Sequence, residues 1–212
     1  MLLIPPFIAQ RLGLYEDSTL GHLHQELYGH IPNTMTKGLT GRLIEQLLGV
    51  TNLNNSSPDL PEFGLELKTL PLSPTLQVKE NTFISTISLP FWEGSFKRSR
   101  LHNKIQSILW IPIIRSGTKM SLLDRIGKAF LIRIDFGTSE ILEQDWNLLT
   151  GLLRQEQYTL ISSHLGEILH IRPKAQSSAH FISIHGQKIN PMGFYFRKSY
   201  TQGLVDRYLK GL

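Results

Sequence analysis

The chain has no cysteine among its 212 residues, which excludes disulfide bonds, thiolate metal sites and cysteine nucleophiles. No apolar run approaches the roughly 18 residues that a membrane helix needs. The apolar start, residues 1–8, lacks the basic region of a signal peptide. Walker and Rossmann glycine patterns are absent as well. We therefore expect a cytoplasmic protein that makes no membrane contact.

Acidic residues are missing from a long stretch near the C-terminus, between Glu167 and Asp206. The basic residues of this interval are Arg172, Lys174, Lys188, Arg197 and Lys198, accompanied by His170, His180 and His185. Solvated surfaces usually intersperse both signs of charge. Neutralisation of phosphates by Lys and Arg, in contrast, is the main source of protein–DNA affinity. Together with a formal charge of +5, the interval predicts a face that binds nucleic acid.

The hydrophobic pattern predicts an α/β (α+β) fold, as one domain or one domain with two lobes. Helices are expected within 8–30, capped by Ser18 or Thr19, and over 37–48, ended by Gly49. Strands are expected from residue 63, at 81–89 paired with that strand, at 101–114 as a central strand, and at 129–136, 167–172 and 192–197. Further helices are expected from 137 and over 199–209. His22 and His24 are expected on the surface.

The segment from Pro58 to Lys68 concentrates two carboxylates and an amine, Asp59, Glu66 and Lys68. Alternation from Phe63 places Glu66 and Lys68 on one face of a strand. The Ser-Ser-Pro-Asp turn can fold Asp59 back beside them. Oxygen donors suit Mg²⁺, and a neighbouring ammonium suits an anionic substrate or a nucleophilic water. The alternative is a surface strand with one ion pair.

Other candidates come from different parts of the chain. Glu45 lies at the edge of the apolar stripe of the 37–48 helix, where it is either a solvated flank residue or a neighbour of Asp59. Lys104 is expected at the entrance of the central strand. The loop from Pro90 to Arg100 interleaves aromatic and basic residues, which fits either nucleic-acid contact or a solvated loop.

The chain resembles the MutH family of methyl-directed mismatch-repair endonucleases, together with its GATC-cutting restriction relatives. The ordered blocks that carry the resemblance are Lys37-Gly38 with 41–49, Asp59 with 63–71, Thr82-Phe83, Lys104 with 109–112, 166–175 and 193–198. A single ExK pattern is weak, but ordered blocks with shared gaps over residues 37–205 are strong. The loop 90–100 and the segment 176–190 depart from the family pattern.

The resemblance implies one endonuclease domain over residues 1–212. Its expected core is of the PD-(D/E)xK type, a mixed central sheet flanked by helices with two lobes around a DNA cleft. Asp59 and Glu66 are the implied Mg²⁺ ligands, and Glu45 is placed at the same site. Lys68 is implied to orient or deprotonate the attacking water, and Lys104 to support the site against the phosphate.

The same resemblance implies the residues that contact DNA. Those residues are Lys37, Phe83, Arg172, Pro173, Lys174 and Tyr195. The three from Arg172 to Lys174 fall in the family's GATC-reading loop, and Tyr195 falls where adenine methylation is sensed. The implied protein is a monomer that acts on double-stranded DNA containing GATC.

The implied function is Mg²⁺-dependent nicking of the unmethylated strand at hemimethylated GATC sites in mismatch repair. MutL is the expected activator, with MutS acting indirectly. The alternatives are a GATC-specific type II restriction endonuclease and, in another class, a catalytically inactive DNA-binding module.

Overall fold

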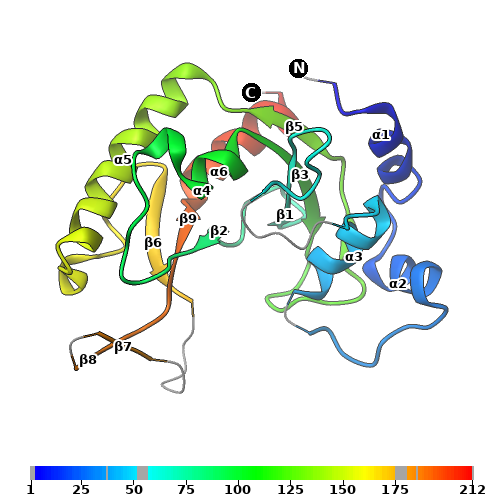
Figure 1. The fold of residues 1–212 in the computed structure, drawn as a ribbon. Coiled ribbons are helices and arrows are strands. Elements are labelled where there is room, and N and C mark those ends of the chain that lie inside the picture. The colour runs from blue at the N-terminus through cyan, green and yellow to red at the C-terminus, as the bar shows by residue number, and fades with distance from the viewer. Residues whose placement is uncertain (1–2, 37, 52–56, 175–180, 185, 212) are drawn as a thin grey trace. The chain divides into compact units, whose positions relative to one another are not determined.

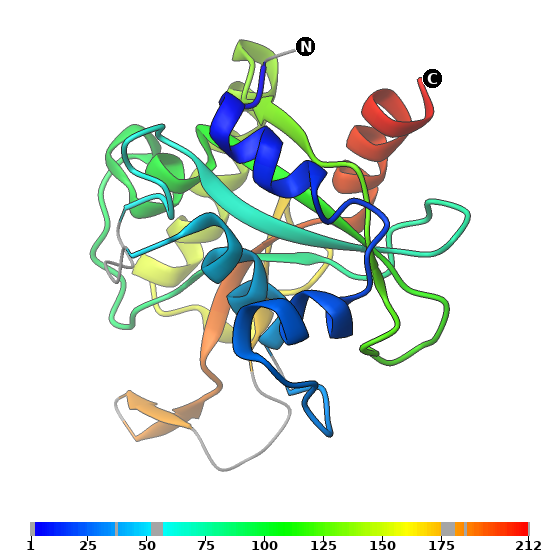
Figure 2. The same cartoon turned by 90° about the vertical axis from the view of Figure 1, so that its right-hand side faces the viewer.

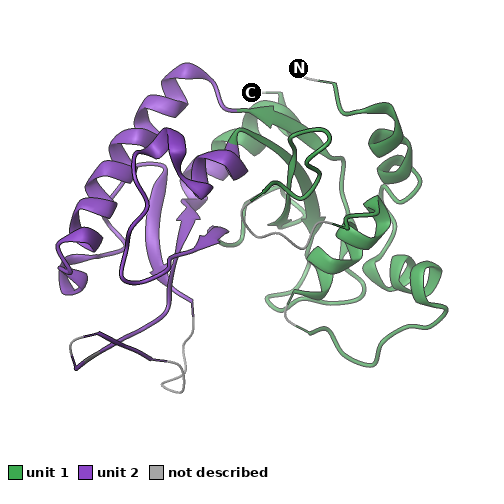
Figure 3. Ribbon diagram, in the orientation of Figure 1, with its two compact units in different colours: residues 1–80, 106–133, 202–212 green, residues 81–105, 134–201 purple. Residues whose placement is uncertain are grey.

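A computed structural model of the chain describes residues 3–36, 38–51, 57–174, 181–184 and 186–211 (Figure 1). The chain divides into two compact units (Figure 3). Unit 1 consists of Met1–Glu80, Gln106–Arg133 and Gln202–Leu212, and unit 2 of Asn81–Ile105 and Ile134–Thr201. Two lobes around a cleft remain a prediction. No helix in the described ranges is both long and apolar enough to cross a membrane.

Three helices form the N-terminal part of unit 1: α1 (Pro6–Gly13), α2 (Leu20–Tyr28) and α3 (Leu39–Leu48). Thr19 caps α2 as expected, because its side chain accepts a hydrogen bond from the His22 backbone N–H. Gly49 ends α3 in the left-handed conformation that glycine adopts without steric cost. The expected helix over 37–48 is thereby confirmed for its described core.

The sheet of unit 1 is mixed and has four strands: β1 (Glu66–Leu72), β3 (Ser107–Ile114), β4 (Arg125–Ile126) and β5 (Phe130–Arg133). The strand β3 pairs in parallel with β1 and in antiparallel with β4 and β5. Its near-continuous burial fits the predicted central position. β1 lies at the edge of the sheet, and this edge carries the expected carboxylates.

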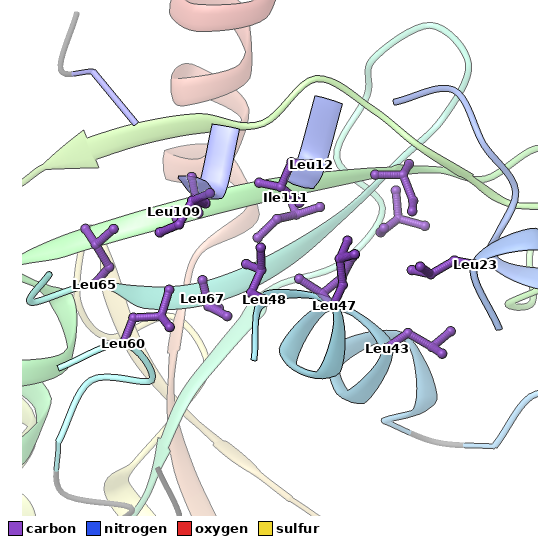
Figure 4. Packing of buried hydrophobic residues seen from close by; sticks show 14 of the residues in the cluster. Leu12, Leu23, Leu43, Leu47, Leu48, Leu60, Leu65, Leu67, Leu109 and Ile111 are labelled. Carbon is purple, nitrogen blue, oxygen red and sulfur yellow. The ribbon is translucent and has the colours of Figure 1, made fainter. Parts of the chain in front are cut away.

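The core of unit 1 forms between the sheet and the three helices, which lie on one face of it (Figure 2). Alternate residues of the strands, such as Leu67, Leu109 and Ile111, join the leucines of α3 there (Figure 4). The opposite face is covered by an aromatic stack. Phe130 lies between Trp110, at 6.4 Å between ring centroids, and Tyr208, at 5.8 Å. Tyr208 belongs to the π-helical segment η3 (Asp206–Lys210).

Unit 2 contains a three-stranded antiparallel sheet in the order β2 (Thr82–Thr86), β9 (Met192–Phe196) and β6 (Leu169–Pro173). A separate ribbon joins β7 (Ile182–Ile184) to β8 (Gln187–Ile189). The helices are α4 (Arg100–Ile105), α5 (Phe136–Arg154) and the start of α6 (Lys198–Val205), with short 3-10 turns η1 (Phe96–Arg98) and η2 (Tyr158–Leu160).

The core of unit 2 centres on Trp146 of α5, which is fully buried and stacks on Phe194 at 5.2 Å between ring centroids. Asp145 beside it fixes the start of β6, because its carboxylate accepts hydrogen bonds from the backbone N–H groups of Glu167, Ile168 and Leu169. Phe194 and Phe196 of β9 are both buried in this core.

Several sequence-based expectations about the elements are wrong. The segment 101–105 is part of helix α4, so only 107–114 forms the central strand. β2 pairs with β9 in unit 2, not with β1. The first strand begins at Glu66, since 61–64 form a turn. The helix expected within 8–30 is present as α2, whereas helix α1 was not predicted.

Two expectations about single residues are also wrong. His24 is buried, not on the surface, and its Nδ1 lies 2.7 Å from the His30 carbonyl oxygen. The C-terminal helix begins at Lys198, one residue before its expected start at 199. The backbone N–H of Lys198 donates to the Asn81 side chain at 2.8 Å.

Candidate functional site

A tight turn brings Asp59 back onto strand β1. Leu60 and Leu65 exchange two backbone hydrogen bonds of 2.9 and 3.1 Å, and Gly64 between them has a φ of 62°, which favours glycine. The Asp59 Oδ2 atom accepts a hydrogen bond of 2.9 Å from the backbone N–H of Leu67. The predicted return of Asp59 is therefore confirmed, although the turn that produces it follows Asp59 and does not precede it.

Glu66 and Lys68 form an ion pair on the face of β1 opposite Leu67. The Lys68 ammonium donates a hydrogen bond of 2.5 Å to Glu66 Oε1. The Glu66 side chain is only 1% exposed and that of Lys68 15%. A carboxylate at such depth is costly without a partner. The alternative of a solvated surface pair is therefore wrong for this strand.

Glu45 of α3 lies within electrostatic range of this pair. Burial raises the pKa of Glu45, and the negative charge of Asp59 raises it further. The positive charges of Lys68 and Arg42 act in the opposite direction. Glu45 is thus a half-buried neighbour of Asp59, Glu66 and Lys68, as expected, and not a solvated flank residue.

The four residues do not form a closed metal cage. Throughout the described ranges, no three His, Asp or Glu side chains lie close enough together to hold a metal ion as a group. Metal binding by Glu45, Asp59 and Glu66 therefore stays a prediction. Lys37 lies outside the described residues.

Lys104 lies half-buried on α4, so the prediction that it stands at the entrance of a strand is wrong. It belongs to unit 2, whereas the carboxylates belong to unit 1. Its support of the carboxylate site also stays a prediction.

A second group of expected residues lies on one face of the sheet of unit 2. Phe83 of β2 is the register partner of Tyr195 on β9, and Tyr195 in turn pairs with His170 on β6. The rings of Phe83 and Tyr195 meet edge to face at 5.3 Å between centroids. Arg172 lies two residues beyond His170 on the same strand, and Pro173 ends that strand; both are exposed. The structure therefore brings together the expected DNA-contacting residues of unit 2.

Lys174 closes this group at one end. Its backbone N–H donates to the Pro191 carbonyl at 2.7 Å, and its ammonium donates to Thr86 Oγ1 at 2.6 Å. The ammonium also lies 5.0 Å from the Phe83 ring centroid, a cation–π distance. The side chain is exposed at the surface yet held in a defined position.

The protonation state of Tyr195 is a further property of this face. Burial raises the pKa of Tyr195, so its phenol is neutral at physiological pH, while the charge of Arg172 acts in the opposite direction. Arg197 differs from its expected outward role. Its guanidinium donates hydrogen bonds of 2.8 Å to the carbonyls of Gly166 and Leu165, where it fixes the loop before β6.

Two residues of this face were missed by the sequence reasoning, Thr86 and Gly193. No sequence pattern could have indicated Thr86, because its hydrogen-bond partner Lys174 is 88 positions away. Gly193 did carry a signal, since an isolated glycine in a strand often marks a close approach of other atoms. A Cβ atom at Gly193 would lie 2.8 Å from the Phe83 ring and 2.9 Å from the Ser85 carbonyl oxygen.

The fold and these residues define an α/β protein with a buried carboxylate–lysine pair at a sheet edge and a cationic, aromatic face on a second sheet. A family model described as "DNA mismatch repair enzyme MutH" matches residues 48–145. The matched part contains Asp59, Glu66, Lys68, Phe83 and Lys104.

Full-length relatives extend the match. The DNA mismatch repair protein MutH of Haemophilus ducreyi is 33% identical over 201 residues, 91% of this chain and 88% of the relative. The MutH protein of Buchnera aphidicola is 34% identical, with 80% and 81% covered, and that of Pasteurella multocida is 30% identical, with 96% of each chain covered. The chain belongs to the MutH family of DNA mismatch repair proteins.

Proposed function

We propose that the chain is a Mg²⁺-dependent endonuclease of methyl-directed mismatch repair that nicks the unmethylated strand at hemimethylated GATC sites. It would act in the cytoplasm as a monomer, with MutL as activator and MutS acting through MutL. The proposal includes a PD-(D/E)xK core in unit 1.

One observation carries this proposal above the others. In a chain of the MutH family, a turn returns Asp59 to the strand that holds the buried Glu66–Lys68 pair. A buried pair of this kind is weak evidence for stability, because desolvation of both charges offsets much of their attraction. The presence of this pair beside two further carboxylates is better explained by chemistry on a charged substrate.

The donor set fits Mg²⁺. Carboxylate oxygens are hard ligands, and Mg²⁺ is usually held by one or two carboxylates plus water and substrate phosphate, without an all-protein cage. Asp59 and Glu66 would hold the ion, with Glu45 at the same site. When bound, Mg²⁺ would polarise the scissile phosphate and lower the pKa of a water molecule.

The remaining chemistry belongs to the chain's own residues. Lys68 Nζ is positioned by Glu66 and can exchange a proton with the attacking water, a contribution of about 10²- to 10⁴-fold for general acid–base catalysis. Lys104 would add positive charge against the phosphate. The turn at 60–65 already fixes Asp59 on the strand that carries Glu66 and Lys68.

Sequence reading is assigned to unit 2. Arg172 and Lys174 have exposed cationic ends suited to base edges, and one good bidentate contact is worth about 1 to 3 kcal/mol of discrimination. Pro173 and Phe83 would contact the DNA beside them, and Lys37 would make a further contact. Tyr195 presents a neutral ring that can distinguish a methyl group from hydrogen by packing.

Plasmid nicking tests the proposal. Plasmids with unmethylated, hemimethylated or fully methylated GATC sites would be incubated with the protein and Mg²⁺, with and without MutL. We expect nicks that MutL stimulates and that are absent from the fully methylated plasmid. Efficient double-strand cleavage without MutL would indicate a restriction enzyme. Inactivity in all conditions would indicate a DNA-binding module.

Matched variants link the activity to the site. Glu66→Gln should abolish nicking, whereas Glu62→Gln changes an exposed carboxylate in the adjacent turn and should leave nicking intact. Equal nicking activity of the two variants would show that Glu66, and with it strand β1, is not part of the active site.

A further inference from the structure

The segment from Pro90 to Arg100 in unit 2 holds one exposed tryptophan between two buried aromatic anchors. Phe91 and Phe96 are buried, and their rings lie 5.6 and 6.1 Å from that of Trp146. Trp92 is 84% exposed. Its exposure is therefore not the result of a loosely packed segment.

Hydrogen bonds between side chains and the backbone hold the same segment in place. The Arg154 guanidinium donates to the carbonyl oxygens of Glu93 and Gly94, at 3.0 Å each. Ser99 Oγ donates to the Phe96 carbonyl at 2.6 Å and accepts from the His102 backbone N–H at 3.0 Å, which joins η1 to α4. The backbone that carries the exposed side chains of this segment is therefore held in a fixed position.

Positive charge dominates those outward side chains. Lys97, Arg98 and Arg100 are exposed. The single acid of the segment, Glu93, is engaged because its carboxylate accepts a hydrogen bond of 3.0 Å from the Arg100 backbone N–H. Three exposed cations and one exposed aromatic ring thus belong to one anchored segment, and they are here named the Trp92 surface (Trp92, Lys97, Arg98 and Arg100).

The chemistry of the Trp92 surface favours a polyanion over a protein partner. A stable protein interface buries about 800 Å² on each side around an apolar centre. Within the segment from Pro90 to Arg100, Trp92 is the only exposed large hydrophobic residue, because Phe91 and Phe96 are buried. Exposed cations and a flat ring carried by one segment suit phosphates and the adjacent deoxyribose instead.

We propose that the Trp92 surface binds the sugar–phosphate backbone of duplex DNA outside the recognition sequence. This proposal rests on the proposed function, because it assumes that unit 2 faces DNA. Contacts to phosphates carry no sequence information but fix the register and orientation of the protein. The surface would therefore lengthen the DNA footprint and raise affinity without changing which bases are read.

The tryptophans provide a direct readout. Trp110 and Trp146 are buried at 1% and 0% exposure, so a neutral quencher such as acrylamide reports chiefly on Trp92. The full chain would be titrated, without Mg²⁺, with two hemimethylated GATC duplexes that differ only in the length of their flanks. We expect the long duplex to protect Trp92 from quenching and the short duplex to leave it accessible. Trp92→Phe should remove the protected signal.

The salt dependence of binding gives a second measurement. Each phosphate contact adds about 0.9 to the slope of log K against log salt. Arg98→Ala/Arg100→Ala should therefore lower the slope by up to about 1.8 on the long duplex, and by little on the short one. Lys119→Ala/Lys128→Ala removes the same charge from exposed positions of unit 1 and should leave the slope nearly unchanged.

The outcomes separate this inference from the proposed function. Full accessibility of Trp92 on both duplexes, or equal slopes for the two double variants, would overturn the inference while plasmid nicking still stood. Protection of Trp92 by MutL but not by DNA would also overturn it. Protection by DNA in a chain that never nicks would support the inference and reject the nuclease.

Discussion

At the scale of single residues, Glu66 and Lys68 can be separated into their structural and chemical roles. Removing one member of a buried pair leaves an uncompensated charge and costs about 3 to 5 kcal/mol, whereas replacing both with apolar residues is often neutral. We expect Lys68→Met to lower the free energy of unfolding by that amount, and Glu66→Leu/Lys68→Met to recover most of it. Urea unfolding of the two variants and the parent chain measures both effects.

Nicking should not recover with stability. The double variant lacks the carboxylate and the amine that the chemistry requires, so its rate should stay at background. A stable double variant that still nicks DNA would show that the pair is structural only.

We expect His170 to make the stability of the chain depend on pH. Burial lowers its pKa, as do the charges of Arg197 and Arg172, while its bond to the Ser163 carbonyl and the charge of Asp145 oppose the shift. Below the ordinary value of about 6.5, the unfolded chain therefore takes up a proton that the folded chain does not. Stability should fall as pH drops through this range, until the lowered pKa of the folded state is reached.

His170→Gln should reduce this loss. Unfolding free energies at pH 8 and pH 5 would be compared for the variant and the parent chain, with His22→Gln as a control at an exposed position. An unchanged difference between the two pH values would assign the acid sensitivity to other groups.

At the scale of elements, the helices and strands that a local sequence pattern encodes could be predicted. The apolar stripe and Gly49 located α3, and the unbroken apolar run located the centre of β3. The stretch 101–105 was assigned to a strand because its apolar residues precede that run directly. In the structure Leu101 and Ile105 are four apart on one buried helical face, a pattern too short to recognise by period alone.

The residues of the candidate sites also divide into those whose meeting a local pattern predicts and those whose meeting it does not. Asp59, Glu66 and Lys68 are close in sequence, so their meeting could be predicted from one turn and one strand. The contact between Lys174 and Thr86 joins distant strands through β9, and no local pattern encodes it.

At the scale of elements, substitution of Gly193 tests the face of the unit 2 sheet that carries the expected DNA-contacting residues. An added methyl group would lie within 3.0 Å of both the Phe83 ring and the Ser85 carbonyl oxygen, and the latter is backbone that moves only with β2. Gly193→Ala should cost roughly 1 to 3 kcal/mol of stability through overpacking. It should also reduce discrimination between GATC and a singly altered site, because Phe83 and Tyr195 are displaced.

Gly203→Ala is the matched control. No atom lies within 4 Å of its would-be Cβ in helix α6, so this change should be neutral or stabilising. Thermal unfolding and competition binding measure the two effects. Normal discrimination by a folded Gly193→Ala variant would show that the position of Phe83 is not set by this glycine.

At the scale of the molecule, the two units are interleaved along the chain. Unit 1 is assembled from three segments and unit 2 from two. Consecutive strands usually lie side by side, and that rule led to the wrong pairing of 81–89 with β1. The chain passes into unit 2 at Asn81, so the neighbour of β2 comes from a strand more than a hundred positions later.

Mg²⁺ should stabilise the whole chain if Asp59 and Glu66 hold it. A ligand at ten times its Kd adds about 1.4 kcal/mol to the unfolding free energy. For a chain of 212 residues this corresponds to a rise in Tm of roughly 3 to 6 °C. Thermal unfolding in MgCl₂ and in KCl of equal ionic strength would measure the rise, and excess EDTA should reverse it.

Asp59→Asn is the informative variant for this measurement. The amide oxygen can still accept the hydrogen bond from the Leu67 backbone N–H, so the turn is retained while one negative charge is removed. We expect the variant to fold and to lose most of the Mg²⁺-dependent rise in Tm, whereas Glu62→Gln should keep it. Because the readout is stability, it identifies the metal ligands whether or not the preparation nicks DNA. An equal rise in all three proteins would place the ion away from β1.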